Sequence, residues 1–392
     1  MPTTFSLRTA RDDAPNALFV ALDRARAAGE RLLDLTTSNP TTAGIPHDAS
    51  AILAAIADPR SLVYAPEPLG LPSAREAAAA TFASHGATVD PSRVALTAST
   101  SEAYAVLFKV LCDPGDEILV PAPSYPLLGF LAEFESVALR TYPLVHAGRW
   151  HVDLEALRAA ISPRTKAIVV VSPNNPTGSY LGEEELERML DLDLPIVSDE
   201  VFATYPMSER VPEGRVATVA GATRGLVFAL SGLSKLAALP QMKLGWIGVS
   251  GAEDLAARAM RRLELVLDAY LSVGTPVQHA LPAILSSRAA AEDAIRARAR
   301  ENLRALRAIM KEAPSASVLD VEGGWYAIVR VPDMKTDERW ALDLAVRDHV
   351  AVQPGYFFDM DRGAHLVVSL LTPEPVFAEG AARLAARVRE DA

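Results

Sequence analysis

Seven short apolar runs, separated by segments with helical patterning, constrain the fold of this chain more than any other feature. They lie between residues 93 and 250 and read RVALTAS, EILVP, ALRTYPL, KAIVVVS, LPIVSDE, LVFALS and LGWIGVS. Continuous apolar runs are typical of strands buried on both faces, and amphipathic stretches such as GEEELERMLDL are typical of the helices that cover them. The pattern therefore predicts an α/β layer with a mainly parallel sheet between helices, at about residues 45–275.

The remainder of the chain has a different character. Two long helices rich in Ala and Arg are predicted between residues 276 and 312, followed by the run ASVLDVEGGWYAIVRVP, a helix, the run HLVVSLLTP and a final helix. This is an α+β pattern, and we expect it to pack with the N-terminal arm. The predicted domains are therefore 45–275, the larger one, and 1–44 together with 276–392, the smaller one.

Composition argues against several function classes. The formal net charge of −11 over 392 residues disfavours non-specific binding to nucleic acid or to an anionic membrane surface. The single cysteine, Cys112, rules out an internal disulfide and is interpreted as an apolar filler. No apolar run approaches the ~20 residues of a membrane span, and the first residues lack the pattern of a secretory signal. A cytoplasmic location is the expectation.

Two common kinds of cofactor are not indicated either. The seven histidines are scattered, and no two of them sit at ligand spacing together with carboxylates, so no metal site is predicted. The Gly-x-Gly-x-x-Gly turn of nicotinamide enzymes is missing after the first predicted strand.

Polar side chains follow the predicted strands at the points where sheets of this kind bind ligands. Ser99, Thr100 and Ser101 follow the first run and open a helix, where hydroxyls and free backbone N–H groups suit a phosphate. The plainer interpretation is a helix cap that involves Glu102.

Four later strand ends each carry one further group: Tyr125, Asn175, Asp199 and Lys235. They offer a ring for stacking, an amide for a ring oxygen, a carboxylate that needs a cation, and a lysine that burial makes nucleophilic toward an aldehyde. Core packing, turn formation and a snorkelling surface lysine are the plainer alternatives. Together these groups describe a site for a flat phosphorylated aldehyde with a pyridine nitrogen, which is pyridoxal 5′-phosphate (PLP).

With these residues in place, the chain resembles the class I and II aminotransferases, fold-type I PLP enzymes of the aspartate aminotransferase superfamily. The resemblance covers essentially the whole chain and rests on the motifs YAPEPLGLPSAREA, STSEA, DPGDEILVPAPSYP, SPNNPTG, SDEVF and SGLSKLAALPQMKLGW. It implies a large PLP-binding domain with a seven-stranded sheet, a smaller α+β domain, and a homodimer with active sites shared across the interface.

The resemblance assigns a role to each of the four strand-end groups. It implies that Lys235 forms the Schiff base with PLP and then moves a proton as general acid and base. It also implies that Asp199 pairs with the pyridinium nitrogen, that Asn175 bonds the ring 3-oxygen, and that Tyr125 stacks on the ring face.

The resemblance further implies how the phosphate is held. Thr100 and Ser101 would bind it with help from Lys243, and Tyr64 would reach the phosphate of the partner subunit. The serine that usually stands three residues before the Schiff-base lysine is shifted by one position in this chain, to Ser231.

Three departures from the family pattern affect the predicted contacts. Lys243 stands where arginine is usual, so that a point charge replaces a bidentate contact, and Phe202 stands where a tyrosine usually donates to the ring oxygen. Val367 stands where the family has the arginine that grips the substrate α-carboxylate. Three explanations stay open: Arg330 or Arg362 supplies the charge, Asn175 and backbone donors hold the carboxylate, or the substrate has no α-carboxylate.

The prediction is therefore a PLP-dependent aminotransferase that moves an amino group from an amino acid to a 2-oxo acid by a ping-pong mechanism. Few charged residues occur in the stretches expected to line the pocket, TSNPT, AYLSV and EGGWY, so a neutral or apolar substrate side chain is predicted, with Asn39 and Asn175 in contact with the substrate. The alternative is a PLP-dependent lyase, decarboxylase or amine transaminase, because the Schiff base is common to all of them. A PLP-binding regulator is disfavoured by the short N-terminal arm and the acidic charge.

Overall fold

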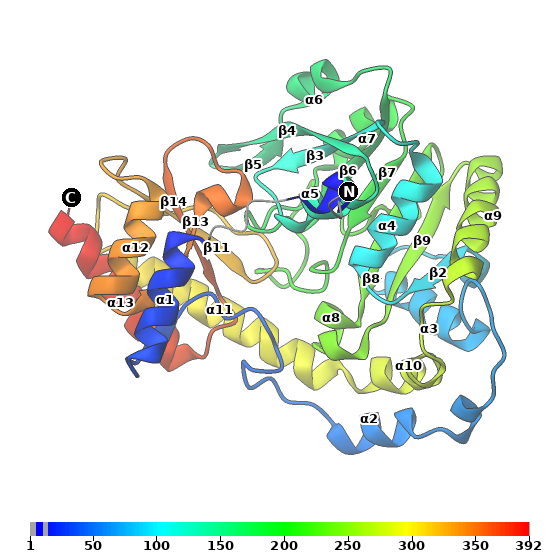
Figure 1. The fold of residues 1–392 in the computed structure, drawn as a ribbon, viewed down its shortest axis with the longest axis horizontal. Helices are drawn as coiled ribbons and strands as arrows, with labels where there is room; N and C mark the ends of the chain where they lie inside the picture. Colours follow the sequence, from blue (N-terminus) through cyan, green and yellow to red (C-terminus); the bar gives the residue numbers. More distant parts are fainter. Residues whose placement is uncertain (1–4, 11–14, 392) are drawn as a thin grey trace.

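The computed structural model describes residues 5–10 and 15–391 of the chain. It has a larger part around an eight-stranded sheet and a smaller part around a four-stranded sheet (Figure 1). The helices α10 (Thr275–Ser287) and α11 (Ala289–Met310) follow one another beneath both parts. No helix within these described ranges is both long enough and apolar enough to cross a membrane.

The large sheet has the strand order β2-β9-β8-β7-β6-β3-β4-β5. The strands from β8 to β4 in that order are mutually parallel, whereas β9 is antiparallel to both of its neighbours. The predicted mainly parallel α/β sheet is therefore confirmed. Its strands are β2 (Val94–Thr97), β3 (Glu117–Ala122), β4 (Ala138–Ala147), β5 (Arg149–Val152), β6 (Thr165–Val171), β7 (Ile196–Asp199), β8 (Leu226–Gly232) and β9 (Gly245–Gly251).

The sheet has one strand more than predicted, namely β5. It forms an antiparallel hairpin with β4, in which Ala147 pairs with Arg149 and Gly148 makes the turn with a φ of 80°. Of the β5 residues only Trp150 is buried. A strand at the sheet edge with one buried side chain has no continuous apolar run, so the pattern that identifies the central strands does not find it.

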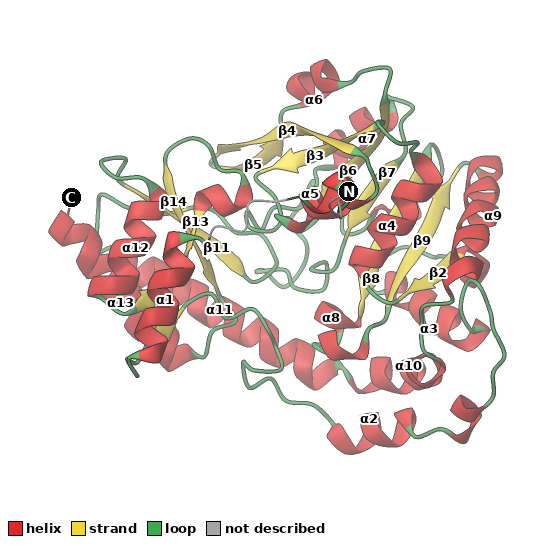
Figure 2. Cartoon of the chain, in the orientation of Figure 1, coloured by secondary structure: helices red, strands yellow, loops and turns green. Residues whose placement is uncertain are grey.

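Helices cover both faces of the large sheet (Figure 2). A separate apolar core lies on each face. One face packs against α4 (Thr100–Leu111), α5 (Leu127–Phe134) and α9 (Glu253–Tyr270). The other packs against α3 (Pro72–Ala83), α6 (Leu154–Ala160), α7 (Glu183–Leu190) and α10, with α2 (Ala49–Ile56) resting on α10. The short helix α8 (Leu233–Leu236) directly follows β8.

The smaller part is built from both ends of the chain. Its antiparallel sheet has the order β10-β11-β14-β13, and the N-terminal β1 pairs in parallel with β12, with Leu33 opposite Val350. Its elements are α1 (Ala17–Ala27), β1 (Leu33–Asp34), β10 (Ser317–Val318), β11 (Tyr326–Val331), α12 (Asp337–Arg347), β12 (Val350–Ala351), β13 (Gln353–Pro354), β14 (Ala364–Ser369) and α13 (Glu374–Asp391).

The apolar cores indicate where the chain divides. Residues of α10 belong to a core of the large sheet, whereas residues of α11 belong to the core of the smaller part. We therefore propose that the division falls between α10 and α11, near residue 288, instead of at residue 275. Short 3-10 helices complete the fold: η1 (Leu7–Thr9), η2 (Pro59–Leu62), η3 (Pro91–Arg93), η4 (Val219–Gly221), η5 (Pro240–Met242) and η6 (Gly355–Phe358).

Candidate active site

A cleft of about 890 Å³ lies between the large sheet and the small sheet. The large-sheet wall comes from loops at the carboxyl ends of β2, β3, β6, β7 and β8, which is where ligands bind in open α/β sheets. The opposite wall comes from α1, β11, β13 and η6. The cleft brings together seven residues predicted to form the site: Thr100, Ser101, Tyr125, Asn175, Asp199, Lys235 and Lys243.

The start of α4 leaves hydroxyl groups free for a ligand. Ser99 is the N-cap and accepts a hydrogen bond from the Glu102 N–H at 3.1 Å, while the Glu102 carboxylate accepts from the Ala98 N–H at 2.5 Å. The expected capping arrangement is therefore present, and it uses only these residues. Thr100 and Ser101 in the first turn line the cleft beyond it, where the N-terminal end of the helix favours an anion.

Two glycines allow the strands below α4 to approach closely. A Cβ on Gly245 would lie 3.1 Å from the backbone of Ser99 and Thr100, and a Cβ on Gly232 would lie 2.9 Å from Gly245. Any larger residue at position 232 would displace β9. The close packing of β8 on β9 therefore explains why this chain has glycine, and not the usual serine, at position 232.

Lys235 is the most deeply buried cation of the cleft. Its Nζ lies 5.0 Å from the centre of the Trp325 ring and 5.7 Å from that of Phe202, and the Tyr205 hydroxyl donates to its backbone carbonyl at 2.6 Å. Burial lowers the pKa of Lys235 to about 8, although the nearby charge of Asp199 acts in the opposite direction. The amine is therefore far more readily deprotonated near neutral pH than an exposed lysine.

Asp199 ends β7 and is likewise buried. Burial raises its pKa to about 6, against hydrogen bonds from the Val201 N–H and the Tyr104 hydroxyl, each at 3.2 Å, and against the charge of Lys235. A carboxylate so placed is stabilised by a further N–H donor or cation from a ligand. Tyr104, on α4, was not among the predicted site residues, because a tyrosine on the apolar face of an amphipathic helix is normally interpreted as a core residue.

Asn175 and Tyr125 flank the same space. The Asn175 side chain is buried and its Oδ1 has no hydrogen-bond partner within residues 5–10 and 15–391, so this amide is left for a ligand. Tyr125 lines the cleft and is 41% exposed as a residue, while partial burial raises the pKa of its hydroxyl to about 12, which keeps it protonated.

Lys243 lines the cleft from an unusual backbone conformation. It follows η5 with φ 52° and ψ 54°, in the left-handed region that non-glycine residues rarely adopt. Residues held in that region cluster at ligand sites, where surrounding structure fixes them. Its position fits the predicted contact to a phosphate.

Three predicted site residues lie outside the cleft. Tyr64 is 81% exposed on the loop after η2. Asn39 is exposed, and its Oδ1 accepts hydrogen bonds from the Thr41 N–H and hydroxyl at 3.1 and 2.8 Å, which makes it a turn residue. Ser231 is still a strand residue, paired with Trp246, because β8 continues through Gly232.

Several cleft residues were missed by the sequence prediction. They lie in different parts of the chain and include Arg26, Ser38, Ser234, Tyr326, Gln353 and Phe358. Ser234 offers the hydroxyl that had been sought at Ser231, and its position directly before Lys235 was the available signal. The others come from the smaller part, and no local motif brings them to the cleft.

The structure narrows the question of the substrate carboxylate. Val367 is fully buried in β14, and neither Arg330, on β11, nor Arg362, on an exposed turn, lines the cleft. Arg26 is the one arginine among the described residues that does. Its side chain is 54% exposed, and its guanidinium pairs with Asp23 at 2.9 Å.

The groups in the cleft fit PLP. Hydroxyls at a helix N-terminus together with a lysine suit its phosphate, and a buried carboxylate suits its protonated ring nitrogen. The unpartnered Asn175 amide suits a ring substituent, and a lysine with a lowered pKa suits its aldehyde. Phe202 carries no hydroxyl and packs edge-on against Trp325 at 4.9 Å, so it adds an apolar wall instead of a hydrogen bond.

Comparison with known proteins places this chain in a family. The sequence profile described as aminotransferase class I and II matches residues 30–376. An alanine aminotransferase of Mycobacterium tuberculosis is 28% identical over 360 residues, which cover 88% of this chain and 82% of the relative. An S-alkyl-thiohydroximate lyase of Arabidopsis thaliana is 29% identical over 203 residues, which cover 50% of this chain and 43% of the relative.

The fold agrees with this match. The structure of an alanine aminotransferase from Pyrococcus furiosus superposes with a TM-score of 0.88 at 26% identity, covering 99% of this chain and all (100%) of that chain. The profile match spans both the large sheet and most of the smaller part, and enzymes of this family use PLP to transfer amino groups. The chain belongs to the class I and II aminotransferase family.

Proposed function

We propose that this aminotransferase moves an amino group from an amino acid with a neutral or apolar side chain to a 2-oxo acid in a ping-pong cycle. The observation that carries the proposal is that Lys235 and Asp199 line one cleft, where burial lowers the pKa of the lysine and raises that of the aspartate. Acid–base sites typically contain two titratable groups, one with a pKa lowered and the other with a pKa raised from its ordinary value.

Each cleft residue then has a role. PLP, when bound, supplies an aldehyde for the amino group and a ring that accepts electrons. Lys235 would hold its aldehyde through Nζ, and the same amine would carry a proton from the substrate Cα to the aldehyde carbon. Asp199 would hold the proton on the ring nitrogen, with Tyr104 orienting the carboxylate at 3.2 Å.

The remaining cofactor contacts are proposed for other residues that line the cleft. Thr100, Ser101 and Lys243 would hold the phosphate, and Ser234 of the same cleft would add a hydroxyl in place of Ser231. Asn175 would donate to the ring oxygen, and Tyr125 would stack on the ring.

Apolar side chains on the outer wall support the proposed substrate class. Phe19 of α1 and Phe357 of η6 stack with ring centroids 5.8 Å apart, and both line the cleft together with Leu18, Leu22 and Phe130. Phe19 is 54% exposed, so that an apolar substrate group covers it on binding.

Two observations are consistent with an alternative reaction. The Arabidopsis thaliana relative is named a lyase, and Val367 removes the charge that selects for a carboxylate. A lyase, a decarboxylase or an amine transaminase would use the same lysine and aspartate.

A homodimer is proposed from the loop that carries Tyr64. Leu62, Val63 and Tyr64 are 90, 64 and 81% exposed, and apolar residues exposed in a row mark an interaction surface. We propose that Tyr64 reaches the phosphate site of the partner subunit. Sedimentation of the wild type and of Tyr64→Glu tests this, because a monomeric wild type would contradict it. The cytoplasmic location stays a prediction.

A half-reaction screen tests the proposed function. Amino acids and simple amines are added singly to the purified PLP-loaded protein, the cofactor absorbance is followed, and Lys235→Ala serves as the blank. Conversion of the cofactor by a neutral or apolar amino acid, without release of ammonia or carbon dioxide, supports the proposal. Ammonia with a 2-oxo acid indicates a lyase, carbon dioxide a decarboxylase, and reaction with amines alone an amine transaminase.

A further inference from the structure

We propose that Gln353 binds the substrate carboxylate through its side-chain amide. The inference rests on the proposed function, since it concerns how the same cleft holds an amino acid. It also names a substrate range, because an amide holds both carboxylates and neutral carboxamides.

The position of Gln353 follows from strand register. β13 pairs with β14 in antiparallel fashion, and Gln353 stands directly opposite Val367. Directly opposed residues of an antiparallel pair project from the same face of the sheet, about 5 Å apart at Cβ. Val367 is fully buried on that face, whereas Gln353 is half-buried and lines the cleft. The Gln353 amide therefore lies beside the position at which Val367 provides no polar group.

The amide is also available. Its side chain makes no hydrogen bond to any residue in the ranges 5–10 and 15–391, although it can donate two and accept at its oxygen. Tyr326, which is opposite Ser369 on the same face, lines the cleft too, but burial raises the pKa of its hydroxyl, although Ser38 acts in the opposite direction. Gln353 is thus a polar group of this wall that none of the described residues engages.

The other candidates in the cleft are already engaged. Asp199, Lys235 and Lys243 have proposed roles toward PLP. Arg26 pairs with Asp23 and is more than half exposed in the last turn of α1, at the rim of the cleft. On the small-sheet side of the cleft, the substrate carboxylate is therefore bound by a neutral donor, the amide of Gln353.

A neutral donor has a consequence for specificity. Arginine offers a fixed fork and a full charge that favour a carboxylate over its neutral analogues. A glutamine amide donates to a carboxylate oxygen, and it donates and accepts with a carboxamide equally well. We expect the cleft to accept amino acids and their amides with affinities within about tenfold of each other.

A binding measurement without turnover tests this inference. The probes are 3-phenylpropionate and its amide, which carry an aromatic body but no amino group, titrated into the PLP-loaded protein by calorimetry. In Gln353→Glu, repulsion between carboxylates should weaken binding of the acid at least about tenfold and leave the amide within about twofold. In Gln353→Met, which keeps the length but not the donors, both probes should bind more weakly.

Matched variants separate the competing explanations. Gln241→Glu adds the same charge at an exposed glutamine outside the cleft and should change neither probe. Arg26→Gln is compared with Arg24→Gln, a neighbour on α1 that does not line the cleft. The proposal is overturned if Gln353→Glu affects both probes equally or neither, or if Arg26→Gln alone weakens the acid. Because no amino transfer is needed, a failure here is distinct from a failure of the half-reaction screen.

Discussion

Two lysines of this chain lie against tryptophan rings and have opposite electrostatic environments. The Lys235 Nζ is 5.0 Å from the Trp325 ring centre, and the Lys335 Nζ is 4.7 Å from that of Trp340. Burial lowers the pKa of Lys235 to about 8. Partial burial acts in the same direction on Lys335, but hydrogen bonds to Asp343 and Asp391 outweigh it and raise its pKa.

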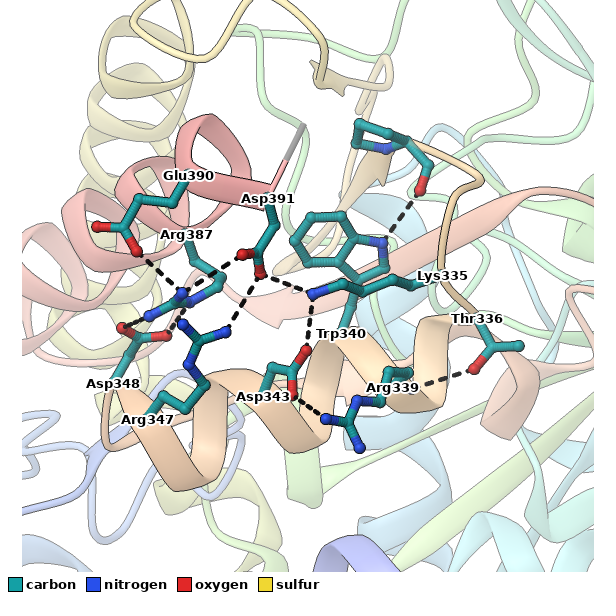
Figure 3. A network of polar contacts seen from close by, with 11 residues as sticks. Lys335, Thr336, Arg339, Trp340, Asp343, Arg347, Asp348, Arg387, Glu390 and Asp391 are labelled. Carbon is teal, nitrogen blue, oxygen red and sulfur yellow. Dashed lines mark hydrogen bonds and ion pairs between the residues drawn. The ribbon is translucent and has the colours of Figure 1, made fainter.

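The difference shows that burial and bonded carboxylates, and not the aromatic contact, set the pKa of each lysine. Lys335 donates to Asp343 at 2.8 Å and to Asp391 at 2.7 Å, and thereby joins α12 to α13 (Figure 3). In the same network Arg387 binds Asp348 through two bonds of 2.8 Å. Lys235 has no carboxylate within hydrogen-bond distance among the described residues, so its amine is available for chemistry.

Replacing Lys235 gives the largest expected effect. Lys235→Met keeps the apolar stem against Trp325 but removes the proton carrier, so kcat should fall by at least about 10³-fold. The measurement is steady-state transamination with the best donor from the half-reaction screen. Lys335→Met is the matched control, and its kcat should stay within about twofold. Equal losses in both variants would contradict a chemical role for Lys235.

Removing the charge of Asp199 comes next. Asp199→Asn keeps the shape of the side chain, but it loses the charged acceptor for the ring nitrogen, so kcat should fall about 10- to 100-fold. In Tyr104→Phe, which removes only the 3.2 Å hydrogen bond to this carboxylate, kcat should fall by a smaller factor. A Tyr104→Phe loss as large as that of Asp199→Asn would contradict direct contact between Asp199 and the cofactor.

The sequence predicted the cleft wall made by the large sheet and missed the other wall. Asp199 and Lys235 each follow a continuous apolar run, so a local pattern places them at one sheet edge. Gln353 and Arg26 reach the cleft only because β13 pairs with β14 and α1 packs on α12. Such pairings join residues far apart in the chain, and no local pattern records them. Ser231 was predicted to bind the cofactor, but β8 continues through Gly232, and the sequence does not define a strand end to within one or two residues.

The pH dependence of stability sharpens the comparison of the two lysines. In an Asp199→Asn background without cofactor, the pKa of Lys235 lies below 8 because the charge of Asp199 is gone, so adding Lys235→Met should stabilise the protein by at least about 3 kcal/mol below pH 8. The gain should vanish as the pH rises toward 10.5, because an unfolded lysine with the higher pKa loses its proton there and burial no longer costs a charge. Denaturant unfolding between pH 7 and 10.5 measures it. A gain that is constant with pH would show that packing, and not charge, is responsible.

The smallest effect concerns the C-terminal network. Lys335→Met should lower the free energy of unfolding by about 1 kcal/mol at pH 7, because Asp343 and Asp391 lose a partner while Arg339 and Arg347 still pair with them.

The sign with pH is opposite to that of Lys235. The folded pKa of Lys335 is raised, so its contribution is complete below the unfolded pKa and is lost as the pH rises through the folded value. The double variant Lys335→Met with Asp343→Asn tests the coupling, since the second change should cost less once the lysine is gone. Strict additivity of the two changes would mean that Lys335 stabilises the protein through its contact with Trp340 alone, and the contrast between the two lysines would then rest on Lys235 only.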